Sequence, residues 1–372
     1  MRILFACGGS GGHINPALGI ANSIKQEHKD AEFLFAGNPT GMEADLIPKA
    51  GYAFAPIKVY GFPRKLTINN IKRNVVAAAC LLTAGSTAKK IISGFKPDVV
   101  VGTGGYVSGP VLMTAAKMGY KTLAHESNAY PGLTTKLLAK QVDKVLLTVE
   151  AAKKHLPEGV EYVVTGTPIR QELLTFDKQE TRKKLGVGDR ICLLSFGGSL
   201  GATPINEAVA DVIAHFKGKN SLHQIHATGK LDWPDFSDML KARGIEKIDD
   251  PHIDVREYIY NMPECIAAAD VVICRSGAVT LMELQCTGKA SILIPSPYLA
   301  ENHQYHNAMV VANKDAAIVI EEKDLTGEKL CRILENLIEN PQDIERLGKN
   351  AGLMAITDPN QRICKEIYSL AK

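Results

Sequence analysis

Short runs of apolar residues alternate with longer amphipathic stretches along the whole chain. Many runs are continuous Val, Ile and Leu segments without polar alternation, which is typical of strands covered on both faces. The stretches between them are long enough for helices, so the pattern predicts strand–helix–strand units and parallel sheets. The predicted strands are residues 3–6, 32–36, 98–101, 121–124, 144–148, 162–165, 191–196, 223–227, 271–274, 290–294 and 317–320.

Both halves of the chain open in the same way. The first predicted strand leads into residues 8–12, which read GGSGG, and the strand over 191–196 leads into residues 197–202, which read GGSLGA. Two such openings predict an α/β fold of two Rossmann-like domains that face a cleft between them. We expect an N-terminal domain over residues 1–166 and a C-terminal domain over 167–357. A helix over 358–372 follows, and the N-terminal domain is one candidate for its packing partner.

Composition narrows the class of protein. A chain of 372 residues fits two domains of about 150 residues each, and 45% apolar with 22% charged residues is ordinary for a globular protein. Lys and Arg total 43 against 40 for Asp and Glu, which is too even for a protein held by nucleic-acid phosphates. The longest apolar stretch, residues 75–84, is shorter than the roughly 20 residues that a spanning helix needs. Residues 1–7 read as a first buried strand rather than a signal segment.

Eight cysteines are spread along the chain, none in a Cys-x-x-Cys pair and most among apolar residues. This usage predicts buried, reduced thiols rather than disulfides or a zinc site.

The two glycine loops are candidate anion sites. Glycines let a ligand approach the main chain, and the helix that follows each loop presents free N–H groups to a phosphate. The alternative is a tight strand–helix turn. The first loop does not fit G-x-G-x-x-G, because Ile14 occupies the third glycine position, so we expect no nicotinamide cofactor.

Four further polar clusters follow predicted strands. Residues 102–110 (GTGGYVSGP) are either a site for a second, polar substrate or a structural turn. Glu126, in the run 125–128 (HESN), is either a base or an anchor for a loop. Glu283, two turns into the helix predicted after residues 275–277, either accepts hydrogen bonds from ribose hydroxyls or is an exposed helical carboxylate. Residues 301–307 (ENHQYHN) suit sugar hydroxyls or form a solvated loop.

Several motifs are absent from the sequence. There is no Asp-x-Asp pair and no phosphate-binding P-loop, and His303 with His306 lacks a third metal ligand at useful spacing. A leaving pyrophosphate would then be stabilised by helix N-termini, main-chain amides and Arg, so we expect neither a protein-held metal nor a cofactor.

Seven segments in this order resemble the MurG family of UDP-N-acetylglucosamine transferases. They are residues 8–16, 104–110, 125–128, 166–170, 197–202, 274–283 and 303–307, so the resemblance runs from residue 1 to about 310. It implies a GT-B fold whose C-terminal domain holds most of the donor, UDP-GlcNAc. It also implies inverting transfer of GlcNAc to the C4 hydroxyl of MurNAc in lipid I, undecaprenyl-pyrophosphoryl-MurNAc-pentapeptide, which makes lipid II.

The resemblance also implies a role for each matched residue. For the donor these are Ser10, Gly11 and Gly12 at the diphosphate and sugar, Asn128 at the GlcNAc, Arg170 and Ser199 at the diphosphate, Ile259 at the uracil, Ala278, Val279, Thr280, Leu281 and Met282 at phosphate and ribose, Glu283 at the ribose hydroxyls, and Gln304 at the sugar. Gly104, Gly105 and Tyr106 would contact the acceptor. One departure is His303, where some members carry the first of two glutamines.

Two residues are candidates for the general base, His13 and Glu126. We favour His13, because a neutral imidazole at the mouth of the first glycine loop can take the acceptor proton.

The lipid acceptor implies contact with a membrane surface. Residues 68–95 carry apolar residues at 68, 71, 75, 79 and 82 and basic residues at 72, 73, 89 and 90, after Arg64 and Lys65. This pattern fits either a face that binds anionic lipid or a helix packed on its own sheet. We expect a peripheral protein at the cytoplasmic face of the cell membrane, with other cell-wall synthesis proteins as further partners.

Two other functions fit the same pattern. One is another GT-B enzyme acting on a UDP-sugar, such as a UDP-GlcNAc 2-epimerase or a different transferase. The other is a UDP-sugar-binding scaffold without catalysis.

Overall fold

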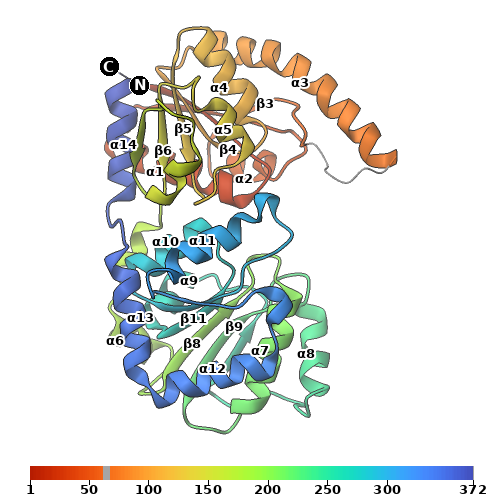
Figure 1. Ribbon diagram of the computed structural model, residues 1–372, viewed down its shortest axis with the longest axis vertical. Helices are drawn as coiled ribbons and strands as arrows, with labels where there is room; N and C mark the ends of the chain where they lie inside the picture. The colour runs from red at the N-terminus through yellow and green to blue at the C-terminus, as the bar shows by residue number, and fades with distance from the viewer. Residues whose placement is uncertain (62–67, 372) are drawn as a thin grey trace. The chain divides into compact units, whose positions relative to one another are not determined.

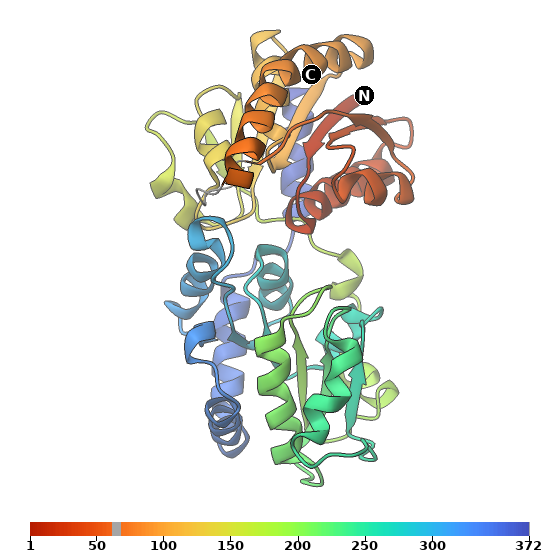
Figure 2. The same cartoon turned by 90° about the vertical axis from the view of Figure 1, so that its right-hand side faces the viewer.

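The computed structural model describes residues 1–61 and 68–371. Their contacts divide the chain into two units, which are Met1–Ile169 together with residues from Asp358 onward, and Arg170–Thr357. Each unit holds one parallel sheet with helices on both faces (Figures 1 and 2). The predicted fold class, two Rossmann-like α/β domains, is confirmed.

The sheet of the first unit has the strand order β3-β2-β1-β4-β5-β6-β7. Its strands are β1 Arg2–Cys7, β2 Glu32–Gly37, β3 Ala53–Pro56, β4 Val99–Gly104, β5 Lys121–Glu126, β6 Lys144–Leu147 and β7 Tyr162–Val164. The chain runs outward from β1 on one side and returns to β4 on the other. The loops after β1 and β4 therefore leave the sheet at its switch point, where α/β proteins place their ligands.

The sheet of the second unit has the order β10-β9-β8-β11-β12-β13, with its switch point between β8 and β11. Its strands are β8 Ile191–Phe196, β9 Leu222–Ala227, β10 Ile253–Arg256, β11 Val271–Cys274, β12 Ala290–Leu293 and β13 Ile318–Val319.

Helices cover both faces of the first sheet (Figure 1). They are α1 Gly11–Glu27, α2 Glu43–Lys49, α3 Ile68–Phe95, α4 Ser108–Lys117, α5 Leu133–Leu138 and α14 Pro359–Leu370, with a 3-10 helix, η1, at Glu150–His155. Along β1, Ile3 and Phe5 pack with α1 and α14, while Leu4 and Ala6 pack with α3 and α4. Because both faces of the strand are buried, its apolar run is continuous.

The second sheet is enclosed in the same way. Its helices are α6 Lys178–Lys184, α7 Thr203–Phe216, α8 Trp233–Lys241, α9 Met262–Ala268, α10 Ala278–Cys286, α11 His303–Ala312, α12 Gly327–Glu339 and α13 Pro341–Leu353, with 3-10 helices η2 Gln171–Leu174, η3 Ala300–Asn302 and η4 Glu322–Asp324. Helices α7, α8 and α12 cover one face, and α9, α10 and α11 cover the other. All eight cysteines are free thiols, and six are buried, as predicted.

Two strands were not predicted, β3 and β10, and each lies at one edge of its sheet; the strands at the other two edges, β7 and β13, were predicted. β3 ends in Pro56 and none of its residues is buried. In β10, Asp254 and Arg256 form an ion pair with each other at 2.5 Å. β3 reads Ala-Phe-Ala-Pro and β10 alternates apolar and charged residues, so neither four-residue segment shows the continuous Val, Ile and Leu run of the central strands.

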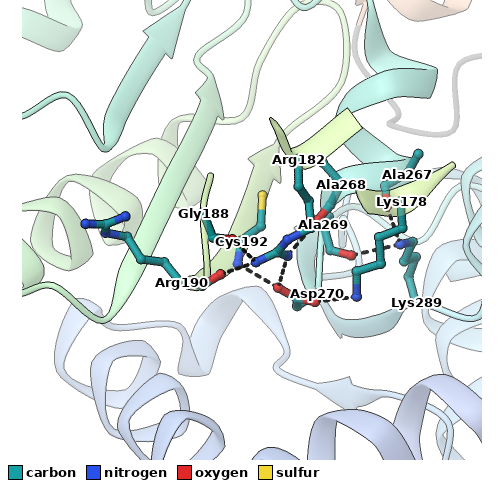
Figure 3. A network of polar contacts seen from close by, with 10 residues as sticks. All are labelled: Lys178, Arg182, Gly188, Arg190, Cys192, Ala267, Ala268, Ala269, Asp270 and Lys289. Atoms are coloured by element: carbon teal, nitrogen blue, oxygen red, sulfur yellow. Dashed lines mark hydrogen bonds and ion pairs between the residues drawn. The ribbon is translucent and has the colours of Figure 1, made fainter. Parts of the chain in front are cut away.

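Asp270 ties three elements together at the amino end of the second sheet (Figure 3). Its carboxylate accepts hydrogen bonds from the Cys192 N–H at 2.8 Å, Arg182 at 2.7 Å and Lys178 at 2.6 Å. Strand β8 and helix α6 are thereby fixed to the start of β11. These contacts lie at the end of the strands opposite the ligand edge, so their role is structural.

Lys289 completes this network from the start of β12 (Figure 3). Its ammonium donates to the carbonyls of Ala267 at 2.7 Å and Ala269 at 2.8 Å, and burial lowers its pKa to about 8. The side chain thus satisfies two carbonyls at the end of α9, where the helix itself leaves them without partners.

His226 on β9 leads to a prediction for acid stability. It is 1% exposed, its Nδ1 lies 2.8 Å from Ser195 Oγ, and burial lowers its pKa to about 4 from an ordinary 6.5. Between these values the unfolded chain binds a proton that the native chain does not. The free energy of unfolding therefore falls as pH drops from 6.5 to 4, by up to about 3 kcal/mol from this group.

We expect His226→Gln to remove this pH-dependent contribution to the free energy of unfolding. Urea unfolding at pH 7 and pH 4.5 measures the change, and the stability difference between wild type and variant should shrink at the lower pH. The exposed His28, replaced by Gln, is the matched control and should leave the pH dependence unchanged. Equal pH slopes for wild type and His226→Gln would contradict the prediction.

Candidate active site

The two glycine clusters of the first unit form one site, because the loops after β1 and β4 touch. A Cβ on Gly105 would lie 2.2 Å from the Gly8 carbonyl oxygen, and a Cβ on Gly104 would lie 2.5 Å from Cδ2 of His13. Gly104 and Gly105 also have positive φ, at 109° and 82°. Only glycine permits this approach, so the cluster at 102–110 holds the β4 loop against the β1 loop.

His13, in the first turn of α1, is held in one orientation. Its Nδ1 lies 3.1 Å from the Gly8 carbonyl oxygen and 3.3 Å from Ser10 Oγ, and the Thr103 hydroxyl donates to the His13 carbonyl at 2.7 Å. A carbonyl only accepts hydrogen bonds, so Nδ1 carries the proton of the neutral ring and Nε2 carries the lone pair. Nε2 lies beside Gly104, and its lone pair makes it the proton-accepting atom of the neutral ring.

Glu126 is the last residue of β5 and is 5% exposed. Oε1 accepts from the N–H of Asn128 at 3.0 Å and from its Nδ2 at 3.2 Å, and Oε2 accepts from the Gly132 N–H at 3.0 Å and the Thr135 hydroxyl at 2.6 Å. Four donors occupy the carboxylate and fix the loop that carries Asn128. This arrangement favours the anchoring role over the role of base.

The first loop of the second unit, after β8, also depends on glycine. A Cβ on Gly201, whose φ is 94°, would lie 2.2 Å from the Thr228 carbonyl oxygen. The loop after β9 therefore supports the loop after β8. Ser199, which lies in the loop after β8 and before α7, is exposed.

Three helices, which follow strands β1, β8 and β11, begin without a side-chain cap. The residues before α1, α7 and α10, which are Ser10, Ala202 and Gly277, make no side-chain hydrogen bond to the helix start. The first N–H groups of each helix are thus available to an anion, and the helix dipole adds to the attraction.

Arg170 and Glu283 form a two-pronged ion pair. Arg170 Nε donates to Oε1 at 2.8 Å and a second guanidinium nitrogen donates to Oε2 at 2.9 Å. Glu283 is 4% exposed, so the alternative of an exposed helical carboxylate is wrong. Leu281 and Met282 are also buried, whereas residues 278–280, in the first turn of α10, are half-buried.

Gln304 joins the start of α11 to the loops that follow β11 and β12. The Ser276 hydroxyl donates to its carbonyl at 2.8 Å, its Oε1 accepts from the Ser296 N–H at 2.9 Å, and Asn307 Nδ2 donates to the Ser276 carbonyl at 3.2 Å. The polar run at 301–307 is thus tied to the loop that precedes α10 rather than solvated throughout.

Ile259 is 2% exposed and packs in the core of the second unit. Its neighbours Tyr258 and Tyr260 are 46% and 90% exposed, and their rings lie 4.9 Å apart. In the first unit Tyr106 is also exposed and covers Gly61. Nothing in the sequence distinguishes Tyr258 or Tyr260, because an isolated aromatic residue gives no sign of its exposure.

Glu43 is a second residue near the site that the sequence does not reveal. It is 1% exposed, begins α2 and accepts a hydrogen bond from the Gly9 N–H at 3.1 Å. Nothing in the surrounding residues 41–45 distinguishes it from an ordinary first-turn acid, and only the folded chain brings it under the glycine loop.

The predicted lipid-binding pattern lies partly outside the described residues, including Arg64, Lys65 and the side chains of positions 68, 71–73, 75, 79 and 82. In the described part of α3, Ala84, Ala88 and Ile92 pack against the sheet, and the basic residues at 89 and 90 are exposed. Among the helices of the described chain, none combines the length and the apolar character that crossing a bilayer requires.

The two halves of the chain match the two domains of one class of enzyme. Residues 3–147 match the glycosyltransferase family 28 N-terminal domain, and residues 192–363 match the glycosyltransferase family 28 C-terminal domain. The protein is therefore a glycosyltransferase with a GT-B fold.

Full-length relatives define the family more narrowly. The chain is 43% identical over 371 residues to the UDP-N-acetylglucosamine--N-acetylmuramyl-(pentapeptide) pyrophosphoryl-undecaprenol N-acetylglucosamine transferase of Thermoanaerobacter sp., with 100% of both chains covered. It is 41% identical over 373 residues to that of Acetivibrio thermocellus, covering 100% and 99%. The crystal structure of Acinetobacter baumannii MurG superimposes with a TM-score of 0.79 at 26% identity, covering 99% of each chain. The chain belongs to the MurG family.

Proposed function

We propose that this protein transfers GlcNAc from UDP-GlcNAc to the C4 hydroxyl of MurNAc in lipid I, making lipid II for peptidoglycan synthesis. Membership of the MurG family supports the two substrates, which are named in the descriptions of its relatives. The single observation that supports the chemistry is the orientation of His13. Its Nδ1 faces the Gly8 carbonyl, so the Nε2 lone pair is left to accept a proton.

In the proposed reaction His13 Nε2 removes the proton of the C4 hydroxyl as that oxygen attacks the anomeric carbon of GlcNAc. The bond from this carbon to UDP breaks on the opposite face, so the configuration inverts. Glu126 holds the loop of Asn128, which contacts the GlcNAc, and the loop of Gly104, Gly105 and Tyr106 receives the acceptor.

The departing UDP carries negative charge that the site must stabilise. We infer that the uncapped starts of α7 and α10 and the guanidinium of Arg170 supply this stabilisation. Ser199 contacts the diphosphate, and Glu283 accepts hydrogen bonds from the ribose. No step then requires a metal ion held by the protein, in keeping with the lack of an Asp-x-Asp pair in the sequence.

A peripheral position at the cytoplasmic face of the membrane follows from the lipid acceptor. One surface of the first unit has suitable chemistry. Leu133 and Leu137, one turn apart on α5, are 64% and 62% exposed, and Lys136 and Lys140 lie beside them in the sequence. Apolar side chains next to cations suit the anionic headgroup region.

The test is an assay of UDP release from UDP-GlcNAc with a lipid I analogue, with and without excess EDTA. We expect release only when the acceptor is present, a product heavier by one GlcNAc in mass spectrometry, and an unchanged rate in EDTA. Epimerised sugar without acceptor would instead indicate a 2-epimerase, and donor binding without turnover would indicate a scaffold. Activity lost in EDTA and restored by Mg²⁺ would overturn the metal-free step.

A further inference from the structure

One peptide group lies between a buried carboxylate and the imidazole of His13. The Gly9 N–H donates to Glu43 Oε2 at 3.1 Å, and the Gly8 carbonyl accepts from His13 Nδ1 at 3.1 Å. The carbonyl of residue 8 and the N–H of residue 9 belong to the same planar peptide unit. A continuous chain of hydrogen bonds therefore runs from Glu43 through this peptide to His13.

Glu43 is built into the glycine loop rather than exposed beside it. Its Oε1 also accepts from the Asn38 N–H at 2.9 Å. Cβ atoms on Gly8, Gly37 and Gly41 would lie 2.2, 2.5 and 2.4 Å from its side-chain atoms, so three glycines make room for it. Within the described part of the chain Glu43 has no cationic partner, and the N–H groups of Gly9 and Asn38 provide its hydrogen bonds.

A buried carboxylate without a cation is unfavourable unless N–H groups compensate its charge. The Gly9 N–H is one of these groups, and an amide whose N–H donates to a carboxylate becomes polarised. Its carbonyl oxygen then accepts a stronger hydrogen bond, because hydrogen bonds in a chain reinforce one another. The acceptor of His13 Nδ1–H is this same carbonyl.

We propose that Glu43 is a positioning residue that acts on His13 through the Gly8–Gly9 peptide. It fixes the ring with Nδ1 protonated and stabilises the imidazolium that forms when Nε2 takes the acceptor proton. This inference rests on the proposed function, in which His13 is the base. The relation resembles that of a carboxylate and a histidine in a hydrolase triad, with a peptide group inserted between them.

Other titratable groups lie around α1 and could affect the pH dependence of His13. Cys7 at the end of β1 stays a neutral thiol, because burial and then the charge of Glu43 raise its pKa. Tyr106 follows the β4 loop that touches His13. On α14, Cys364 and Tyr368 face Glu27 at the far end of α1, and burial raises the pKa of both. None of these groups forms a hydrogen bond to the His13 ring in the described residues.

The test is Glu43→Gln, which keeps the shape and removes the charge. We expect kcat to fall about 10-fold with little change in KM for UDP-GlcNAc. The acid limb of the kcat/KM profile should move to lower pH by about half a unit to one unit, because the imidazolium loses support. Asp45→Asn is the matched control on the same helix. Asp45 is exposed and pairs with Lys49, so neither quantity should change.

A second set of variants separates the two proposals. If His13→Ala leaves turnover unchanged, the base assignment fails. A different result would rule out the proposed action of Glu43 on His13 through the Gly8–Gly9 peptide, which we call the relay. If His13→Ala is inactive but Glu43→Gln shows an unshifted acid limb and a raised KM, Glu43 only supports the loop and the relay is wrong. On the relay, Glu43→Gln adds little to His13→Ala, since both remove the same interaction.

A measurement on the unmodified protein covers the case in which Glu43→Gln does not fold. Nitrogen-15 spectra of histidine-labelled protein, with His13 assigned by its loss in His13→Gln, report the ring tautomer. The relay requires the proton on Nδ1. A neutral His13 protonated on Nε2 would overturn it.

Discussion

Replacing His13 with alanine is expected to lower kcat about 1000-fold and to leave KM for UDP-GlcNAc within about threefold. The imidazole is the proton acceptor in the proposed transfer, and its Nε2 lone pair is held in place by the Nδ1 contact to Gly8. Donor binding does not use that lone pair, so the loss is confined to the transfer step. Steady-state UDP release with a lipid I analogue measures both constants.

A control for this variant is His215→Asn. His215 Nε2 lies 2.6 Å from Glu335 Oε1 at the surface of the second unit, and its loss should leave turnover as in wild type. Thermal unfolding of both variants checks that each is folded. More than a tenth of wild-type turnover in folded His13→Ala would exclude this residue as the base.

Replacing Glu283 with glutamine is expected to weaken UDP binding about 10- to 100-fold, the range for hydrogen bonds to a charged group. The Arg170 fork uses one acceptor position on each carboxylate oxygen, and a carboxylate has about four, so positions remain for the ribose hydroxyls. The variant loses the negative charge that binds both Arg170 and the ribose hydroxyls. Isothermal titration calorimetry with UDP measures the effect.

A ligand without the ribose hydroxyls distinguishes a direct role of Glu283 from an indirect one. With 2′,3′-dideoxy-UDP, wild type and Glu283→Gln should differ much less, since the hydroxyls that Glu283 contacts are missing. Glu335→Gln, a change at a half-buried acid of the same unit, is the matched control and should bind UDP normally. An equal loss of affinity for both ligands would mean that Glu283 acts through Arg170 and not on the ribose.

The fold was predictable from the sequence because its signal is repeated. Central parallel strands are buried on both faces, and runs such as residues 3–6 and 271–274 show this directly. The edge strands β3 and β10 have no such requirement and escaped detection. The end of β5 shows a smaller difference. His125 and Glu126 belong to the strand itself, whereas the predicted strand ended at residue 124.

The site was predictable in its loops and not in its contacts. A cluster of glycines in a sequence indicates where the backbone must turn or approach another segment closely. Gly104 and Gly105, which have positive φ in the structure, are an example. The partners of polar side chains leave no such pattern. The four donors to Glu126 and the buried Glu43 were set by tertiary packing, which periodicity along the chain does not encode.

The two units also differ in when they can be completed during synthesis. Arg170–Thr357 is one uninterrupted segment, so its sheet and helices can assemble as soon as that segment has emerged from the ribosome. The other unit is begun first and finished last, since α14, which packs along α1, is made only after the whole intervening unit. Until then the apolar side chains of the first unit that pack with Ile363 and Ile367 lack these partners, and transiently exposed apolar surface of this kind favours aggregation of incomplete chains.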